Sequence, residues 1–202
     1  MDTQKLIRGF DVSKWQSPDA IEYSKAKEWG YSFMFARYAY GIMTDSTFMR
    51  HVVRAMRYGL LVGAYQYMVP QQTAVAQAQA AANIGKDLPL GMALDVEEGA
   101  LRPESVDAWV REYLRLTGKQ PIIYTSKSKW QEVYKGKKHA HGGLPLWVAN
   151  YTSAASPAMP DGWSKYTFWQ HSTAGDKLLL PGKELDLNRF NGTAEALGKL
   201  AS

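Results

Sequence analysis

The sequence PLGMALDVEE, residues 89–98, joins an apolar run to three acidic residues. Its first six residues carry no charge, which is typical of a strand buried on both faces. If the run is a strand, its side chains alternate between two faces, so Asp95 and Glu97 share a face about 6–7 Å apart. Taken alone, the pair also fits a solvated acidic loop after a strand. The rest of the chain has to decide between these interpretations.

Segments of strand and helix character alternate on both sides of this stretch. Strands are predicted at 6–12, 31–38, 60–69, the LDVEE stretch, 121–125, 144–151, 166–172 and 185–190. Helices are predicted at 18–29, 45–58, 71–84, 103–117 and 126–134, with a short one possible at 193–202. Such alternation favours a parallel sheet with helices outside, and eight strands can close a barrel. We predict one α/β domain over residues 1–202, an irregular TIM-like (β/α)5(β)3 barrel of eight strands and about five helices.

The composition is that of an ordinary globular protein. Of the 202 residues, 46% are hydrophobic and 21% are charged, and none is cysteine, which excludes disulfides and thiolate metal sites. The N-terminus lacks the apolar segment of a secretory signal, and the longest apolar candidate for a membrane span, 60–69, is too short. The net charge of +5 favours an anionic partner.

Motifs for other chemistries are weak or missing. The four histidines show no metal-ligand spacing beyond His139 and His141, which lie in a basic loop. The sequence has no Gly-x-Ser-x-Gly elbow and neither of the common glycine-rich phosphate-binding motifs. Binding of nucleic acid would depend on charge alone. We therefore expect no metal, no cofactor and no nucleic-acid partner.

Polar and aromatic residues recur where the predicted strands end, and in such a barrel these ends meet at one mouth. The acidic members are Asp11, Asp95, Glu97 and Asp186, and the others are Arg37, Tyr65, Tyr67, Tyr124, Trp147, Asn150, Trp169 and Gln170. Aromatic rings stack on the apolar faces of sugars, and polar groups bind their hydroxyls. Glycosidic bond cleavage needs two carboxyls, one to protonate the departing oxygen and one to stabilise the positive charge at the anomeric carbon. The set predicts a sugar-cleaving site.

Structural roles remain open for several of these residues. Asp11 could cap the turn toward the helix that follows it. Asp186 could pair with Arg189 or, across the barrel, with Arg37. The aromatic residues of the third and sixth strands could belong to the core, as strand aromatics usually do. The collective pattern favours a site, because four carboxylates independently fall at strand ends.

Six motifs resemble glycoside hydrolase family 25, the Chalaropsis-type lysozymes common among bacteriophage endolysins. They are GFDVSKWQ at 9–16, LDVEE at 94–98, PIIYTS at 121–126, LWVANY at 146–151, FWQHS at 168–172 and LDLNRFNG at 185–192. The likeness follows the family's order over nearly the whole chain. It implies a barrel of eight strands and five helices, in agreement with the count above.

The resemblance also implies an activity, hydrolysis of the β-1,4 bond between N-acetylmuramic acid and N-acetylglucosamine in peptidoglycan. It makes Glu97 the general acid and later the base for the incoming water. Asp95 would orient the substrate's 2-acetamido group, whose carbonyl oxygen attacks the anomeric carbon. Asp11 and Asp186 match the family's other acidic positions, which help to hold the charge and the sugar. The expected partner is peptidoglycan, bound by a monomer without membrane insertion.

Two positions depart from the family pattern. The third strand usually ends in a Tyr-His-Phe-like triplet, where this chain has Tyr65, Gln66 and Tyr67, and a Lys often stands where this chain has Arg37. Neither change removes a catalytic carboxylate, so both bear on substrate preference more than on activity.

Two other functions remain compatible with the sequence. One is a catalytically silent peptidoglycan-binding module, against which the intact carboxylates count, and the other is a different glycosidase such as a chitinase. Without a signal segment, we expect the protein to be made in the cytoplasm and to act on the wall after release or non-classical export. We also expect no separate wall-binding domain, because only a short segment follows residue 192.

Overall fold

The computed structural model describes residues 7–174, 179–180 and 184–201. Three predictions therefore fall partly outside it: the start of the first strand at Leu6, most of the N-terminal segment that was searched for a signal, and the end of the last helix at Ser202. Among the described residues, no helix is both long and apolar enough to cross a bilayer.

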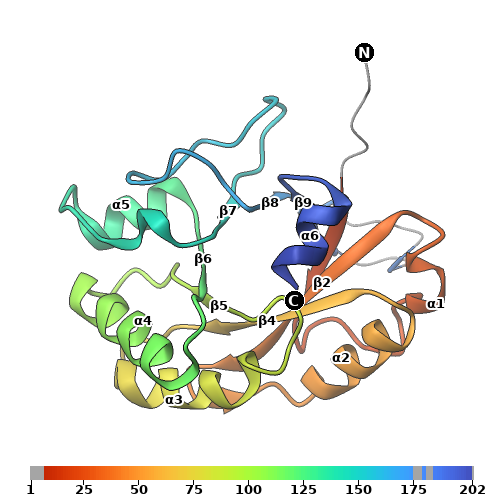
Figure 1. Ribbon diagram of the computed structural model, residues 1–202, viewed down its shortest axis with the longest axis horizontal. Helices are drawn as coiled ribbons and strands as arrows, with labels where there is room; N and C mark the ends of the chain where they lie inside the picture. The colour runs from red at the N-terminus through yellow and green to blue at the C-terminus, as the bar shows by residue number, and fades with distance from the viewer. Residues whose placement is uncertain (1–6, 175–178, 181–183, 202) are drawn as a thin grey trace.

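Nine strands of the described chain form one sheet, which closes into a barrel through the pairing of β1 with β2 (Figure 1). They are β1 (Ile7–Val12), β2 (Tyr31–Tyr40), β3 (Met43–Thr44), β4 (Leu61–Tyr67), β5 (Met92–Asp95), β6 (Ile122–Thr125), β7 (Leu146–Ala149), β8 (Phe168–Ser172) and β9 (Asp186–Phe190). The two-residue β3 only folds back on β2 as a hairpin. The predicted eight-stranded barrel is confirmed, with β3 added at its rim.

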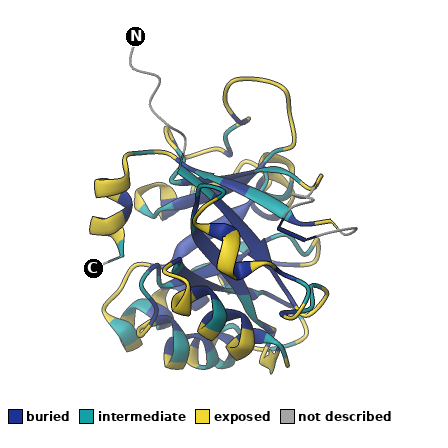
Figure 2. Ribbon diagram, turned by 90° about the vertical axis from the view of Figure 1, so that its right-hand side faces the viewer, coloured by how far each residue is buried: buried dark blue, intermediate teal, exposed yellow. Residues whose placement is uncertain are grey.

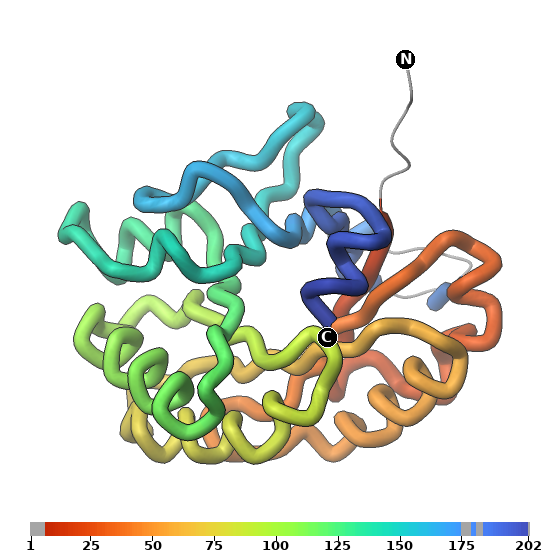
Figure 3. Tube along the Cα trace, in the orientation of Figure 1, coloured from red at the N-terminus to blue at the C-terminus, as the bar shows by residue number. Residues whose placement is uncertain are grey.

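The sheet is mixed, which corrects the expectation of parallel strands throughout. Strand β9 runs antiparallel to both of its neighbours, β8 and β1. Antiparallel strands can be joined by a loop, whereas parallel neighbours need a crossover connection. Figure 3 shows the consequence, because the blue C-terminal part of the chain returns beside the red β1 and closes the barrel.

Six α-helices occur in the described chain, one more than the five predicted with a firm range. They are α1 (Tyr23–Ala26), α2 (Phe48–Arg57), α3 (Ala74–Gly85), α4 (Pro103–Thr117), α5 (Lys127–Tyr134) and α6 (Ala194–Leu200), and a 3-10 turn spans His141–Gly143. The bounds of α4 are those predicted, with proline in the first turn and Gly118 in the left-handed conformation just past the end.

The prediction of a long helix at 18–29 is wrong, because only the single turn α1 forms there. The backbone N–H of Ala20 donates to the carbonyl of Ser17, which closes a turn instead of starting a helix. The N–H of Glu22 donates to the carbonyl of Leu179, far away in the sequence. The carbonyl of Ser17 and the N–H of Glu22, which a helix over 18–29 would have paired internally, are thus bonded elsewhere.

Two layers of apolar side chains hold the barrel, one inside the sheet and one between the sheet and the helices. The inner layer includes Phe33, Phe35, Trp147 and Phe168, and the rings of Phe35 and Trp147 stack with centroids 4.5 Å apart. Leu197 of α6 joins this inner layer. Figure 2 shows the strands buried at the centre and the exposed faces of the helices outside.

Two glycines make room for the inner aromatic layer. A Cβ at Gly9 would lie 2.3 Å from the ring of Phe33, and a Cβ at Gly63 would lie 2.3 Å from the ring of Phe35. No side chain fits at such a distance. The glycines of β1 and β4 therefore allow phenylalanines to fill the lower part of the barrel, which leaves the open upper end for polar residues.

Candidate active site

One pocket opens where the parallel strands end and encloses about 140 Å³. Its lining consists of Asp11, Arg37, Tyr65, Tyr67, Asp95, Glu97, Tyr124, Trp147, Gln170 and Asp186. These are ten of the twelve residues that the sequence singled out, and they come from eight strands and the segment after β5. The predicted convergence of side chains at one mouth is therefore observed.

Asp11 lies at the bottom of the pocket and is 4% exposed. Its Oδ2 atom accepts hydrogen bonds from Gln170 Nε2 at 2.9 Å and from Asn188 Nδ2 at 2.7 Å. Among the described residues Asp11 caps no helix, which was the structural alternative. Burial raises the pKa of Asp11 well above its ordinary value, and the nearby charge of Asp186 adds to this, while the two amide donors act in the opposite direction.

Asp95 is the last residue of β5 and is 3% exposed. Its Oδ1 atom is buried and, among the described residues, has no hydrogen-bond partner. Burial is the main reason that its pKa is raised well above the usual range, and the charges of Glu97 and Asp11 add to the effect. A buried acceptor oxygen without a donor costs free energy, so this atom is suited to receive a hydrogen bond from a ligand.

Glu97 lies two residues beyond the end of β5, and its side chain still points into the pocket. The N–H of Val96 donates to the carbonyl of Tyr124, and the Val96 carbonyl accepts from Thr125 Oγ1. These bonds extend the strand pairing past Asp95, which preserves the side-chain alternation that the sequence predicted. Burial raises the pKa of Glu97, and the ammonium of Lys129 opposes the rise.

Asp186 enters the pocket by a different route from the other acids. It is the first residue of β9, and because β9 is antiparallel, its beginning lies at the end of the barrel where the parallel strands finish. Asp186 is the cross-strand partner of Asp11. Burial, with the charge of Glu184, raises its pKa to about 6. Within the described residues it forms no ion pair with Arg189 or Arg37, the two partners that the sequence left open.

Arg37 lines the pocket but is held from behind by Asp45. The Nε atom of Arg37 lies 2.9 Å from Asp45 Oδ2, and both side chains are largely buried. The same oxygen accepts the backbone N–H of Lys14 at 2.8 Å. Asp45 therefore joins the end of β2 to the loop after β1, and it leaves the rest of the guanidinium facing the pocket.

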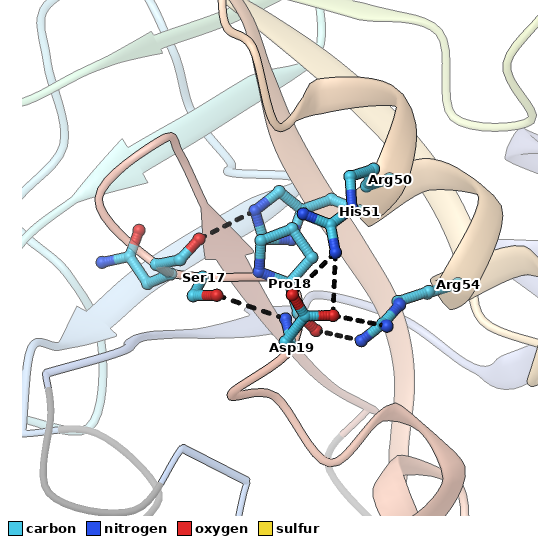
Figure 4. A network of polar contacts seen from close by, with 7 residues as sticks. Ser17, Pro18, Asp19, Arg50, His51 and Arg54 are labelled. Atoms are coloured by element: carbon cyan, nitrogen blue, oxygen red, sulfur yellow. Dashed lines mark hydrogen bonds and ion pairs between the residues drawn. The ribbon is translucent and has the colours of Figure 1, made fainter.

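The loop after β1 is also fixed by α2, as Figure 4 shows. Arg50 and Arg54 of α2 both form ion pairs with Asp19, and His51 bonds through Nε2 to the carbonyl of Gln16 at 3.0 Å. Burial lowers the pKa of His51 to about 4, so its ring is neutral near neutral pH. The segment that follows Asp11 is thus anchored by two separate sets of contacts.

Aromatic side chains form the wall around the acids. Tyr124 donates from its hydroxyl to Gln170 Oε1 at 2.8 Å, and Trp147 donates from Nε1 to Asn188 Oδ1 at 2.7 Å. The ring of Tyr67 stacks on the half-exposed Tyr40, with centroids 4.8 Å apart and an interplanar angle of 12°. Such a wall can contact the apolar face of a sugar ring while fixing the amides that hold Asp11.

Two predicted site residues do not line the pocket. Trp169 lies between Phe168 and Gln170 on β8, so it points to the opposite face of the sheet, where its Nε1 donates to the carbonyl of Asn150. The side chain of Asn150 accepts the backbone N–H of Ala158 at 2.9 Å. Both residues support the long β7–β8 connection, which extends away from the barrel in Figure 1.

Sequence reasoning missed three residues that shape the pocket, namely Asn188, Tyr151 and Asp45. Asn188 is two positions from Asp186 on β9, and Tyr151 follows Trp147 by four, where its hydroxyl donates to Gln170 Oε1 at 2.6 Å. The period of two along a strand could have identified Asn188 and Tyr151. Asp45 had no such signal, because it lies outside the strands.

The histidines and acids do not point to a metal site. Among the described residues, no group of three or more His, Cys, Asp or Glu side chains is arranged to hold an ion. His139 and His141 instead pack against Trp130 with ring centroids 4.9 and 5.9 Å away. The ionisable groups that line the pocket are its four carboxyls, Arg37 and three tyrosines.

The arrangement can transfer protons. All four acids have raised pKa values, chiefly because of burial, so the pocket retains protons at a higher pH than solvated carboxyls would. A carboxyl of this kind can protonate a departing oxygen, and its ionised neighbours can stabilise positive charge on the other side of the bond.

Comparison with known proteins agrees with this chemistry. Residues 10–178 match the family model described as glycosyl hydrolases family 25. The chain belongs to glycosyl hydrolase family 25. Lysozyme M1 of Streptomyces globisporus is 29% identical to it over 97% of this chain and 71% of that protein.

Solved structures of a family 25 lysozyme and of a muramidase share the fold. A lysozyme from Aspergillus fumigatus superposes with a TM-score of 0.85 at 28% identity, covering 98% of this chain and 100% of that one. A muramidase from Acremonium alcalophilum gives 0.84 at 29% identity, covering 96% and 98%. The barrel described above is thus the irregular TIM-like barrel of family 25, with one antiparallel strand.

Proposed function

We propose that this family 25 protein is an N-acetylmuramidase that cleaves the β-1,4 bond between N-acetylmuramic acid and N-acetylglucosamine in peptidoglycan. The names of its relatives, lysozyme and muramidase, support this substrate. The observation that carries the proposal is the pocket itself, in which Asp95 and Glu97 face one cavity with Asp11 and Asp186. Its small volume fits the reacting part of a sugar, so the remaining glycan lies across the mouth.

Glu97 is the general acid in this proposal. Its raised pKa keeps a proton on the carboxyl at a higher pH than a solvated glutamate would retain. That proton passes to the glycosidic oxygen as the bond to the anomeric carbon breaks. In the second half of the reaction, the ionised Glu97 takes a proton from the incoming water.

Asp95 orients the substrate's 2-acetamido group. Its buried Oδ1 atom accepts the acetamido N–H, which gives this oxygen the hydrogen bond that it otherwise lacks. The acetamido carbonyl oxygen is then turned toward the anomeric carbon, which it attacks from the face opposite the departing oxygen. Because a glycan of N-acetylated sugars supplies this group itself, the pocket needs no nucleophile from the protein.

Replacing Glu97 by Gln tests the proposal. The variant keeps the shape of the side chain but has no proton to give, so release of reducing ends from purified peptidoglycan should fall by at least about a hundredfold. Glu195→Gln, an exposed change in α6, is the matched control and should keep full activity.

The same assay separates the proposal from its alternatives. If Glu97→Gln cleaved peptidoglycan as fast as the parent protein, the assignment of the acid would be wrong. A parent protein that sedimented with peptidoglycan without releasing reducing ends would be a silent binding module. Faster turnover of chitin than of peptidoglycan would indicate a different glycosidase.

A further inference from the structure

A second concavity lies close to the catalytic pocket and encloses about 500 Å³. It is lined by Pro70 and Gln71, which follow β4, and by Ala100, Arg102 and Ser105, which lie between β5 and the first turn of α4. Pro70 comes three residues after Tyr67, and Ala100 comes three residues after Glu97. Because consecutive Cα atoms are 3.8 Å apart, each pair is separated by at most about 11 Å. The two hollows are therefore adjacent parts of one end of the barrel.

The lining of this concavity is suited to a peptide with carboxylate groups. Arg102 is exposed, and within the described part of the chain its guanidinium has no hydrogen bond or ion pair. Gln71 and Ser105 add an amide and a hydroxyl, while Pro70 and Ala100 are small and apolar. A guanidinium binds a carboxylate through two parallel hydrogen bonds.

Two acidic side chains lie near this surface. Glu98 accepts the hydroxyl of Tyr67 at 3.0 Å, and the exposed Glu104 lies 3.8 Å from Lys137. Both already have polar partners, and neither lines the concavity. The charge that the lining itself presents is the guanidinium of Arg102, which suits a ligand that carries a carboxylate.

The peptidoglycan glycan carries such a ligand on the sugar that is cleaved. Each muramic acid bears a lactyl ether at C3, next to the acetamido carbon, and the peptide stem starts from that lactyl group. The stem contains free or amidated carboxyls and, at its diamino acid, an amino group. If the acetamido group is at Asp95, the stem leaves the ring only a few bonds away and must pass over one side of the mouth.

On one side, the segment after β5 is covered by a side chain of α5. Glu132 of α5 lies directly beside Gly99, and it also forms an ion pair with Lys129 at 3.3 Å. The concavity lies on the other side of this segment, toward Pro70 and Arg102. We propose that this concavity binds the peptide stem of the substrate, with Arg102 holding a stem carboxylate. This inference rests on the proposed muramidase function.

The test compares Arg102→Gln with the parent protein on two substrates. One is peptidoglycan with intact stems, and the other is the same glycan after an amidase has removed its stems. On the stem-bearing substrate, KM should rise about three- to tenfold with kcat nearly unchanged. On the stem-free glycan, both constants should stay the same. Ala100→Trp, which fills the concavity from an exposed position, should have the same selective effect.

Arg111→Gln is the matched control, because it removes the same charge from an exposed position farther along α4. It should leave both substrates unaffected. Equal kinetics of Arg102→Gln and the parent on stem-bearing glycan, or an equal loss on both substrates, would overturn the inference while leaving the muramidase proposal standing. A parent protein that cleaved neither substrate would instead overturn the proposed function.

Discussion

Asp186 shows how a single residue of the pocket makes the stability of the fold depend on pH. Its pKa is raised from an ordinary value of 3.8 to about 6, mainly by burial. A carboxyl with a raised pKa binds its proton more tightly in the folded state than in the unfolded state. Its contribution to stability is thus complete below about pH 4 and is lost as the pH rises through about 6.

Asp186→Asn should therefore stabilise the protein at pH 8 by about 1–3 kcal/mol, because it removes a charge that the fold solvates poorly. The advantage should shrink as the pH falls from about 6 to about 4. Thermal unfolding at several pH values measures it, with the exposed Asp87→Asn as a control that should give no such trend. A stabilisation of equal size at pH 4 and pH 8 would contradict the assigned cause.

Individual residues also show which parts of the pocket could be predicted from the sequence and which could not. Asp11, Asp95 and Glu97 could be placed because each lies near the C-terminal end of a strand, and alternation along the strand fixes the face. Asp186 could not be placed in this way, because it begins β9 and reaches the mouth only through the antiparallel direction of that strand. Applied fully, the same rule would have excluded Trp169, whose neighbour Gln170 lines the pocket, and would have included Asn188. The pairing of Arg37 with Asp45 could not be predicted, since it joins segments whose contact depends on the closed barrel.

At the scale of elements, Gln66 connects β4 to three other parts of the fold. Its Nε2 atom donates to the carbonyls of Gly41 and Gln77, and its Oε1 accepts from Trp109 Nε1 at 2.7 Å. Gln66 is fully buried and points away from the pocket, opposite to its neighbours Tyr65 and Tyr67. The departure from the family's triplet at this position is thus directed toward the helix layer rather than toward a substrate.

Gln66→Leu should lower the free energy of unfolding by about 2–4 kcal/mol, because two carbonyls and an indole N–H lose their partner. The kcat of the folded fraction should change little. Chemical denaturation together with active-site-normalised kinetics measures both effects. The same substitution at Gln79, which is exposed on α3, should be close to neutral, and a large loss of kcat at full stability in Gln66→Leu would mean that this side chain acts on the site.

Element boundaries were predicted less well than element order. The range of α4 could be read from proline at its start and glycine at its end, since both act locally. The range of α1 could not, because the bond from Glu22 to the carbonyl of Leu179 is a long-range contact. The direction of β9 likewise could not be predicted, because it depends on the long-range pairing with β1 that closes the barrel.

At the scale of the whole molecule, the net charge of +5 favours anionic partners, and we propose that it attracts the protein to anionic wall polymers over a long range. Added salt shortens the range of this attraction from about 10 Å at 0.1 M to about 3 Å at 1 M. Lysis of whole walls should therefore slow steeply with salt, while cleavage of a short soluble glycan should change little. Lysis rates that do not depend on salt would remove the role of charge.

The fold brings acidic side chains that lie far apart in the sequence into one pocket, and we propose that Glu97 protonates a glycosidic oxygen there. Mass spectrometry of the products from digested peptidoglycan tests this most directly. Fragments that end in reducing N-acetylmuramic acid, formed by the parent protein and absent with Glu97→Gln, are the predicted result. Fragments that end in reducing N-acetylglucosamine, or no fragments at all, would contradict it.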